Sequence, residues 1–335
     1  MIDHIRRVVA GEHLVLDDMR DAVGSIMDGR ATPAQVAALL VALHLKGETA
    51  DEIAGAAAAM RAHAIAVPVT RRPIVDVCGT GGDASGTFNI STAVAFVVAG
   101  AGVTVAKHGN RAMSSKCGSA DVLEALGVRI DASPEVAAAA LDAHGIAFLF
   151  AQAYHPAMRY VAPVRREIGV RTLFNIIGPL SNPAGAQRQV VGVPRLELLG
   201  LVAVALSRLG CERAAVVHGH GGLDELSLAG PNRVAEWTGD DVIEYAIDPM
   251  ALGIERRPNE ELAGGDAARN AELVRRVLAA ERGPHRDVVV LNAALALVIA
   301  GVADDLTAGL RLALEAIDDG RAREKLDALV RATNR

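Results

Sequence analysis

The stretch from Asp76 to Thr92 constrains the fold of this chain most strongly. An apolar run at 74–77 opens into a loop that holds four glycines, and an apolar helix follows. Glycine tolerates φ > 0 and lets backbone N–H groups approach a ligand closely. We expect Asn89 to cap the helix and Ser91 to lie in its first turn. Because a helix N-terminus with free N–H groups binds anions, this strand–loop–helix unit predicts a site for phosphate or pyrophosphate.

A second polar loop follows a strand expected at 103–106. It runs from Lys107 to Ser119 and mixes Lys, His, Asn, Arg and Ser side chains more densely than an exposed turn does. Lys107 supplies a point charge for phosphate oxygens. Gly118 is expected to start another helix. Two polar loops that each leave a strand predict one shared crevice.

An acidic pair, Asp224-Glu225, lies in a glycine-rich loop after a strand expected at 214–218. Mg²⁺ prefers carboxylates together with water and substrate phosphate, so the position of this pair favours a metal site over plain surface charge. His218 and His220 resemble zinc ligands, but the further ligands of such a site are missing.

Three arginines, Arg165, Arg166 and Arg171, lie close together in the sequence. Arginine binds a carboxylate bidentately, so this segment is a candidate site for a carboxylate ligand. Helix-surface charge paired with Glu167 explains at least one of the three.

The first 66 residues are predicted to be all helical. Thr32 and Thr49 each begin a capping box, and Asp17 is expected to cap an earlier helix. From residue 72 onward strands and helices alternate, which indicates a mixed, largely parallel central sheet flanked by helices. The expected strands lie at 74–77, 103–106, 146–150, 189–193 and 214–218, with antiparallel strands added around Gly230-Pro-Asn. We therefore predict an α/β fold in which a small helical domain (1–66, with a helical contribution from about 160–182) precedes a larger α/β domain (72–335).

The composition excludes several classes of protein. The net charge of −6 disfavours nucleic acid as the partner. The longest apolar run, 288–302, is interrupted by Asn292 and is short for a bilayer span, so we expect a buried helix and no membrane association. The N-terminus is no signal peptide, and three widely spaced cysteines fit a reduced compartment, which predicts a cytoplasmic protein.

The motifs of the chain together resemble those of the anthranilate phosphoribosyltransferase family, in the nucleoside phosphorylase-like class of phosphoribosyltransferases. The resemblance covers nearly the whole chain. It rests on Gly79-Thr-Gly-Gly-Asp83, Asn89-Ile-Ser-Thr92, Lys107-His-Gly-Asn-Arg111, Gly118-Ser-Ala-Asp-Val-Leu-Glu-Ala-Leu-Gly127, His155-Pro-Ala-Met158, Pro163-Val-Arg-Arg-Glu167, Arg171-Thr-Leu-Phe-Asn175, Gly178-Pro-Leu180, Leu223-Asp-Glu225, Gly264-Gly-Asp-Ala267 and Leu291-Asn-Ala-Ala294. Ala112 and Cys117 stand where serine is frequent in the family.

The resemblance implies transfer of the phosphoribosyl group of 5-phosphoribosyl 1-pyrophosphate to anthranilate, with Mg²⁺ as cofactor, in tryptophan biosynthesis. It also implies a homodimer formed through the helical domain. The implied phosphoribosyl pyrophosphate site comprises Gly79, Gly82, Asp83, Thr87, Asn89, Ile90, Ser91, Thr92, Lys107, His108, Gly109, Asn110, Arg111, Ala112, Met113, Ser114, Ser115 and Ser119. The implied anthranilate contacts are Gly79, Asn110 and Arg165, the implied Mg²⁺ ligands are Ser91, Asp224 and Glu225, and the implied catalytic residues are Lys107, Asn110 and Arg165.

Two alternative functions are compatible with a chain of this kind. A pyrimidine nucleoside phosphorylase of related fold would use inorganic phosphate without Mg²⁺, and the acidic pair speaks against it. A nucleic-acid-binding relative without transferase activity would show a basic cleft and a degraded second loop. The net charge and the intact loop that starts at Lys107 oppose that interpretation.

Overall fold

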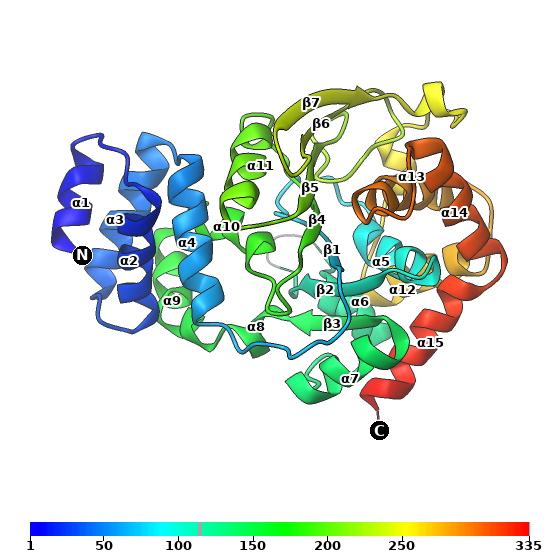
Figure 1. Cartoon of the computed structure of the whole chain (residues 1–335), viewed down its shortest axis with the longest axis horizontal. Helices are drawn as coiled ribbons and strands as arrows, with labels where there is room; N and C mark the ends of the chain where they lie inside the picture. Colours follow the sequence, from blue (N-terminus) through cyan, green and yellow to red (C-terminus); the bar gives the residue numbers. More distant parts are fainter. Residues whose placement is uncertain (113–115, 335) are drawn as a thin grey trace.

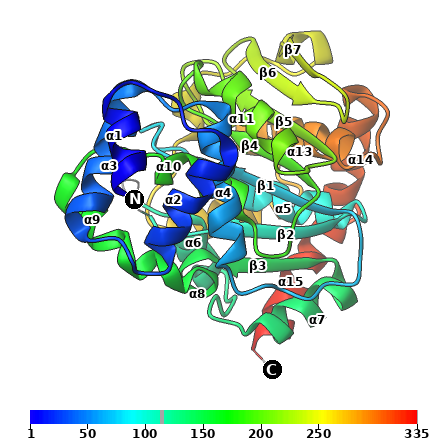
Figure 2. The same cartoon turned by 60° about the vertical axis from the view of Figure 1, so that its left-hand side comes forward.

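The computed structural model describes residues 1–112 and 116–334. A helical bundle lies at one end, beside a larger α/β body (Figure 1). The turned view in Figure 2 brings this bundle to the front of the sheet. The bundle contains α1 (Ile2–Val9), α2 (Leu16–Met27), α3 (Pro33–Lys46) and α4 (Ala50–Ala62).

The α/β body is built on one seven-stranded sheet in the order β3-β2-β1-β4-β5-β6-β7. The strands are β1 (Ile74–Gly79), β2 (Thr104–Gly109), β3 (Ile146–Phe150), β4 (Arg188–Gly192), β5 (Arg213–His218), β6 (Asn232–Trp237) and β7 (Val242–Ile247). The first five strands pair in parallel, whereas β6 pairs antiparallel with both β5 and β7. This confirms the predicted mixed, largely parallel sheet.

Helices cover both faces of the sheet. The helices after the bundle are α5 (Ile90–Gly100), α6 (Ser119–Ala125), α7 (Pro134–His144), α8 (Ala151–Tyr154), α9 (Ala162–Ile168), α10 (Phe174–Ile177), α11 (Leu198–Arg208), α12 (Ala267–Leu278), α13 (Pro284–Ile299), α14 (Leu306–Asp318) and α15 (Arg321–Thr333). Of these, α9 packs against α3 of the bundle (Figure 1). The described part of the chain also contains four 3-10 turns: η1 (Pro156–Tyr160), η2 (Pro179–Ser181), η3 (Pro249–Leu252) and η4 (Asn259–Leu262). The apolar run near residue 290 forms the buried helix α13, as predicted. Among the described residues, no helix combines the length and apolar character needed to cross a membrane.

The alternation of side chains along β1 divides the core. Val75 and Val77 pack into a cluster with α5 and α13 on one face. Cys78 points the other way, into a cluster shared with α4, α10 and α11. The bundle core is continuous with this second cluster, so the bundle is attached to one face of the sheet through apolar contacts. Arg171, which follows α9, donates to the Gly81 carbonyl just beyond β1, so a segment beside the bundle reaches the carboxyl end of this strand.

The predicted helix starts have mixed outcomes. Both capping boxes are confirmed, since the Thr32 hydroxyl accepts from the Gln35 N–H and the Thr49 hydroxyl from the Glu52 N–H. The predicted cap at Asp17 is wrong. Helix α2 begins one residue earlier, and Asp17 lies in its first turn, where its carboxylate pairs with Arg20 at 3.0 Å.

The predicted antiparallel strands are present, but their turn differs from the prediction. Gly230 and Pro231 directly precede β6, and the tight turn between β6 and β7 lies at 238–241 instead. There the Thr238 N–H donates to the Asp241 carbonyl at 3.0 Å, and the Thr238 hydroxyl accepts from the Asp240 and Asp241 N–H groups. The proline ring cannot donate to the ladder, so it stands outside the strand.

Candidate active site

The polar segments of the site begin inside the sheet. Strand β2 extends to Gly109, so Lys107 and His108 belong to a strand and not, as predicted, to a loop. The reason is the ladder with β3, which pairs Lys107 with Phe148 and Gly109 with Phe150. Consecutive residues of a strand face opposite sides of the sheet. The side chains of Lys107 and His108 therefore lie on opposite faces of the sheet.

Lys107 faces the N-terminus of α5. Its ammonium group donates to the Val77 carbonyl at 2.7 Å and lies 3.2 Å from the Ser91 hydroxyl, and the side chain is only 4% exposed. The hydrogen bond to the Val77 carbonyl, on β1, holds the buried ammonium group in place. Its position beside the first turn of α5 gives this end of the sheet a fixed positive charge.

Asp224 and Glu225 reach the same place from the loop after β5. One Asp224 oxygen (Oδ2) accepts from the Gly81 N–H at 2.8 Å, and the Glu225 carboxylate accepts from the Ser91 N–H at 3.1 Å. The loop passes so close to β1 and β4 that a Cβ atom at Gly79 or Gly192 would overlap Asp224. These glycines are required for close approach, independently of φ.

The acidic pair is unusually hard to ionise in this position. Burial raises the pKa of Asp224, and the nearby Asp83 carboxylate raises it further. Burial and the Asp224 charge likewise raise the pKa of Glu225. Low dielectric disfavours the charged form of a carboxylate, and a like charge beside it adds to the effect. Two such groups side by side create a strong local demand for a cation.

The donor set fits Mg²⁺. Within residues 1–112 and 116–334 no cluster of three or more His, Cys, Asp or Glu side chains has metal-binding geometry. Mg²⁺ does not need such a cluster, because it is commonly held by one or two carboxylates and completed by water and substrate phosphate. Asp224, Glu225 and the Ser91 hydroxyl supply oxygen donors of the right chemistry.

The arginines of the 159–171 segment divide into different roles. Arg165, on α9, is partly buried and its guanidinium lies 5.9 Å from the centre of the Phe174 ring. Burial lowers the pKa of Arg165, and the neighbouring Arg171 lowers it further. Arg171 donates to the Gly81 carbonyl at 3.0 Å. Arg166 is exposed on the same helix. Arg165 and Arg171 therefore concentrate positive charge beside the glycine loop.

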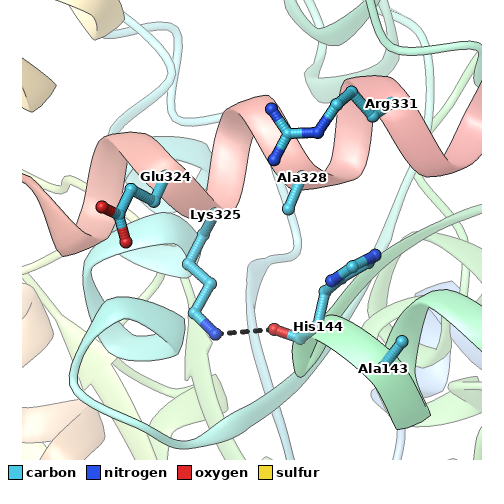
Figure 3. A pocket seen from close by; sticks show the side chains of 6 residues that line it. All are labelled: Ala143, His144, Glu324, Lys325, Ala328 and Arg331. Atoms are coloured by element: carbon cyan, nitrogen blue, oxygen red, sulfur yellow. Dashed lines mark hydrogen bonds between the residues drawn. The ribbon is translucent and has the colours of Figure 1, made fainter.

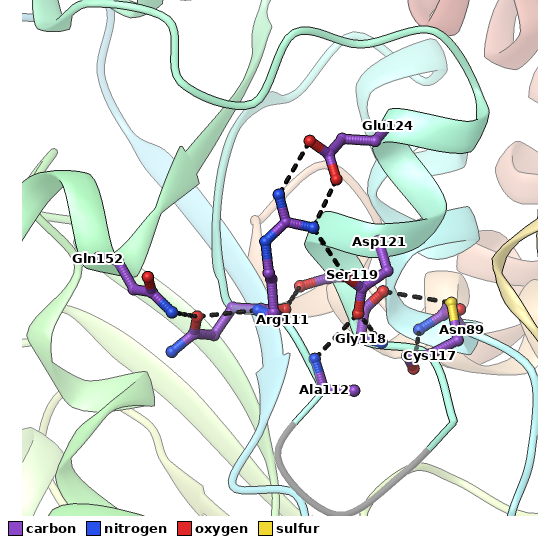
Figure 4. A network of polar contacts seen from close by, with 10 residues as sticks. Asn89, Arg111, Ala112, Cys117, Gly118, Ser119, Asp121, Glu124 and Gln152 are labelled. Atoms are coloured by element: carbon purple, nitrogen blue, oxygen red, sulfur yellow. Dashed lines mark hydrogen bonds and ion pairs between the residues drawn. The ribbon is translucent and has the colours of Figure 1, made fainter. Parts of the chain in front are cut away.

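Asp121, at the start of α6, binds the described residues on both sides of the loop after β2 (Figure 4). One Asp121 oxygen (Oδ2) accepts from the Ala112 N–H at 3.0 Å and from the Gly118 N–H at 2.8 Å. Arg111 forms a bidentate pair with Glu124 and also contacts Asp121. In this structure Arg111 is thus engaged by helix α6. The predicted site residues Met113, Ser114 and Ser115 lie outside the described residues.

Asn110 and Ser119 join the two ends of this loop. The Ser119 hydroxyl donates to the Asn110 carbonyl at 3.2 Å. The Asn110 side-chain oxygen accepts from the Arg111 N–H at 2.8 Å and from Gln152 at 3.4 Å. A Cβ atom at Gly109 would overlap the Ser119 hydroxyl, so Ser119 packs tightly against the end of β2.

The glycine loop after β1 holds the remaining predicted residues. Gly82 has a φ of +80°, and Asp83 accepts from the Ser85 N–H at 3.2 Å. Thr87 pairs its hydroxyl with that of Ser85. Ile90 and Thr92 are buried in the first turn of α5. The Thr92 hydroxyl has no hydrogen-bond partner among the described residues.

The cap predicted at Asn89 is corrected by the structure. Asn89 does occupy the N-cap position of α5, but its side chain makes no capping bond to the helix. Instead its amide donates to the Cys117 carbonyl at 3.2 Å and its oxygen accepts from Asn270 at 2.9 Å. Asn89 therefore ties the two predicted phosphate loops together. One helix N–H, that of Ser91, is taken by Glu225.

His108 faces away from Lys107, into a buried polar network that the sequence reasoning missed. Its main-chain N–H donates to Asp76 at 3.2 Å, and its ring nitrogen lies 3.2 Å from that of His155. Asn182 donates to Asp76 at 2.8 Å and to the Ala106 carbonyl at 2.8 Å. Asp76, an acidic residue in an otherwise apolar strand, could have indicated this network in the sequence, because buried acidic residues are rare unless they have partners. Burial lowers the pKa of His108 to about 3.

Asn292 is a second supporting residue that was missed. Its side chain accepts from the Leu226 N–H at 2.8 Å and donates to the Leu226 carbonyl at 2.9 Å. Helix α13 thereby holds the chain directly after Glu225. In the sequence, Asn292 is a single polar residue within an apolar run, and this pattern could have indicated a buried side chain that binds the main chain of another segment.

A separate hollow lies between α7 and α15, lined by His144, Glu324, Lys325 and Arg331 among others (Figure 3). Lys325 donates there to the His144 carbonyl at 2.7 Å. Neither helix carries a residue of the candidate site, so this hollow is distinct from it.

Known proteins share both the fold and its division into two parts. Residues 71–323 match the α/β domain of a glycosyl transferase family, and residues 2–64 match the helical bundle domain of that family. The fold and the site thus define a glycosyl transferase with a bundle and an α/β body.

Closer relatives narrow the class. An anthranilate phosphoribosyltransferase of Desulforamulus reducens is 54% identical over 97% of this chain and 94% of its own length. The crystal structure of the corresponding enzyme from Thermus thermophilus is 47% identical, with a TM-score of 0.95 over 99% of this chain and 100% of that one. A Saccharomyces cerevisiae enzyme of the same name, in complex with PRPP and Mg, is 27% identical with a TM-score of 0.90, covering 99% of this chain and 97% of that one. The chain belongs to the anthranilate phosphoribosyltransferase family.

Proposed function

We propose that this enzyme transfers the phosphoribosyl group of 5-phosphoribosyl 1-pyrophosphate to the amine of anthranilate, with Mg²⁺ as cofactor. The products are N-(5-phosphoribosyl)anthranilate and pyrophosphate. The observation that carries the proposal is the partly buried pair Asp224 and Glu225 beside Lys107 and the first turn of α5. The partly buried Arg165 nearby supplies a site for the carboxylate of the acceptor.

The reaction exchanges one bond at C1 of the ribose. The amine nitrogen forms a bond to C1 while the bond from C1 to the pyrophosphate oxygen breaks, through an oxocarbenium-like transition state. Lys107, beside the first turn of α5, stabilises the charge that develops on the pyrophosphate. When bound, Mg²⁺ neutralises charge on the phosphate oxygens. Arg165 binds the acceptor carboxylate and thereby aligns the amine.

The transferred proton needs no base from the protein. The amine of anthranilate is neutral near pH 7, and after attack the aryl ammonium nitrogen is acidic enough to release its proton to water. His108 is unsuited to this task, because its ring faces His155 and its buried position lowers its pKa to about 3. We therefore assign catalysis to positioning and electrostatic stabilisation.

The fluorescence of anthranilate provides the decisive assay. The protein is mixed with anthranilate and phosphoribosyl pyrophosphate, with and without Mg²⁺, and the loss of anthranilate fluorescence is followed. We expect consumption that depends on both phosphoribosyl pyrophosphate and Mg²⁺. The phosphorylase alternative predicts a different result. Anthranilate would not be consumed even with both phosphoribosyl pyrophosphate and Mg²⁺ present, and the protein would instead cleave a pyrimidine nucleoside with inorganic phosphate.

We also propose the organisation in which the enzyme works. Residues 1–66, with the returning segment 160–182, form one domain and residues 72–335 the other. The separate family matches of residues 2–64 and 71–323 support this division, and the packing of α9 on α3 and of α10 on α4 supports the contribution of the returning segment. Exposed apolar side chains on the bundle, including Val9 (69% exposed) and Leu45 (80% exposed), support a homodimer formed through it. Sedimentation of the wild type and of Leu45→Glu tests the dimer. We place the enzyme in the cytoplasm, the compartment that keeps cysteines such as Cys78 reduced.

A further inference from the structure

One residue of the glycine loop is held from two directions. The Gly81 N–H donates to Asp224 at 2.8 Å, and the Gly81 carbonyl accepts from Arg171 at 3.0 Å. Asp224 comes from the loop after β5, whereas Arg171 follows α9 and lies just beyond Arg165 in the chain. Gly81 therefore stands between the proposed metal carboxylates and the segment that carries the acceptor site.

The neighbouring backbone is shaped to admit the guanidinium. Gly82 has a φ of +80°, and a Cβ atom at this position would overlap the Arg171 guanidinium. A residue with a side chain would be strained by this φ and would also displace Arg171. The contact between Arg171 and the loop is thus built into the loop conformation.

The charges around Arg171 agree with this placement. Arg171 is exposed in part, and its partial burial and the nearby Arg195 lower its pKa, whereas the Asp224 charge raises it. In the part of the chain that the structure describes, the guanidinium makes its hydrogen bond to a carbonyl, and no ion pair neutralises it. Arg171 therefore combines a directed hydrogen bond with a charge close enough to act on Asp224.

We propose that Arg171 is a positioning residue that holds Gly81 against Asp224 and so couples the acceptor side of the site to the metal side. The proposal rests on the proposed function for its catalytic consequence, but not for the contact itself. A loop with four glycines has a large backbone entropy, so a fixed conformation requires external bonds. Without Arg171 the Gly81 N–H leaves Asp224 more often, and the carboxylate loses one of the groups that orient it.

The contact is tested first in the ligand-free protein by hydrogen exchange. Arg171→Met keeps the aliphatic stem and removes every donor, and Arg166→Met on the exposed face of α9 is the matched control. We expect amides between residues 79 and 88 to exchange roughly fivefold faster in Arg171→Met, the factor that one net hydrogen bond carries, with α5 and α9 unchanged. Exchange equal to that of the wild type and of the control would overturn the proposal. This measurement uses no substrate, so it remains informative even if the proposed reaction is wrong.

Steady-state kinetics and calorimetry test the coupling. For Arg171→Met we expect the half-activating Mg²⁺ concentration, the KM for phosphoribosyl pyrophosphate and its calorimetric Kd in Mg²⁺ to rise roughly fivefold. The KM for anthranilate should stay within about twofold, since Arg165 is intact. Arg171→Lys, which restores one donor, should recover part of the loss. A rise confined to the anthranilate KM would place Arg171 on the acceptor carboxylate and refute the positioning role.

Discussion

Replacing Arg165 by glutamine isolates the proposed recognition of the acceptor carboxylate. No acidic side chain contributes to the environment of Arg165 in the described part of the chain, while burial and Arg171 both lower its pKa. Its charge is therefore available to a ligand. A hydrogen bond to a charged partner contributes about 1.5–3 kcal/mol. Since about 1.4 kcal/mol is a factor of ten, Arg165→Gln should raise the anthranilate KM roughly 10- to 150-fold.

The assay follows anthranilate fluorescence while each substrate is varied in turn. The KM for phosphoribosyl pyrophosphate should change little, because Lys107 and the start of α5 are untouched. Aniline, which lacks the carboxylate, provides the matched substrate: the wild type should prefer anthranilate over aniline, and Arg165→Gln should lose most of that preference. Arg165→Lys keeps the charge without the bidentate geometry and should fall between the two.

Two results would refute the assignment. The first is an equal rise in KM for both substrates, which would indicate a general distortion of the site. The second is a variant that prefers anthranilate over aniline as strongly as the wild type does. Thermal unfolding supplies the folding control, and we expect no loss of stability because the substitution removes a partly buried cation.

Further predictions concern the metal site, the buried histidines and the glycine loop. Asp224→Asn with Glu225→Gln should abolish activity yet stabilise the ligand-free protein at pH 8, since burial raises both carboxylate pKa values; thermal unfolding that is unchanged or lower contradicts this. Burial lowers the pKa of His155 to about 4, so the unfolded chain binds more protons between pH 4 and 6.5 and stability is lost as pH falls through this range. From pH 7 to pH 5 this loss is about 2 kcal/mol. In urea unfolding, the free energy of unfolding of the wild type should exceed that of His155→Gln by less at pH 5 than at pH 7, and the difference should shrink by that amount. Parallel pH profiles of the two proteins would contradict this prediction. Gly82→Ala should displace Arg171 and weaken phosphoribosyl pyrophosphate binding, measured by calorimetry; an unaltered Kd counts against the close contact.

Much of the fold follows from patterns that are local in the chain. The five parallel strands and most helices lie close to where apolar periodicity and turn residues predict them, and the Thr32 and Thr49 boxes form as expected. The wrong predictions were also based on local sequence patterns, but contacts between distant segments overrode those patterns. Lys107 and His108 look like loop residues because they are polar, yet pairing with β3 extends the strand through them. Asn89 looks like a helix cap, yet Asn270 and the Cys117 carbonyl compete for its side chain.

The sequence by itself determined the α/β class, the glycine loop and its helix, the acidic pair and the family resemblance. Only the tertiary structure decided which groups meet. Ser91 and Glu225 are 134 positions apart, and Gly81 and Arg171 are 90 apart, yet each pair is joined by a hydrogen bond. The physical reason is that parallel strands bring their carboxyl ends to one edge of the sheet, where loops distant in the chain converge. Strand alternation then separated Lys107 from His108, which neighbouring positions in a sequence do not reveal.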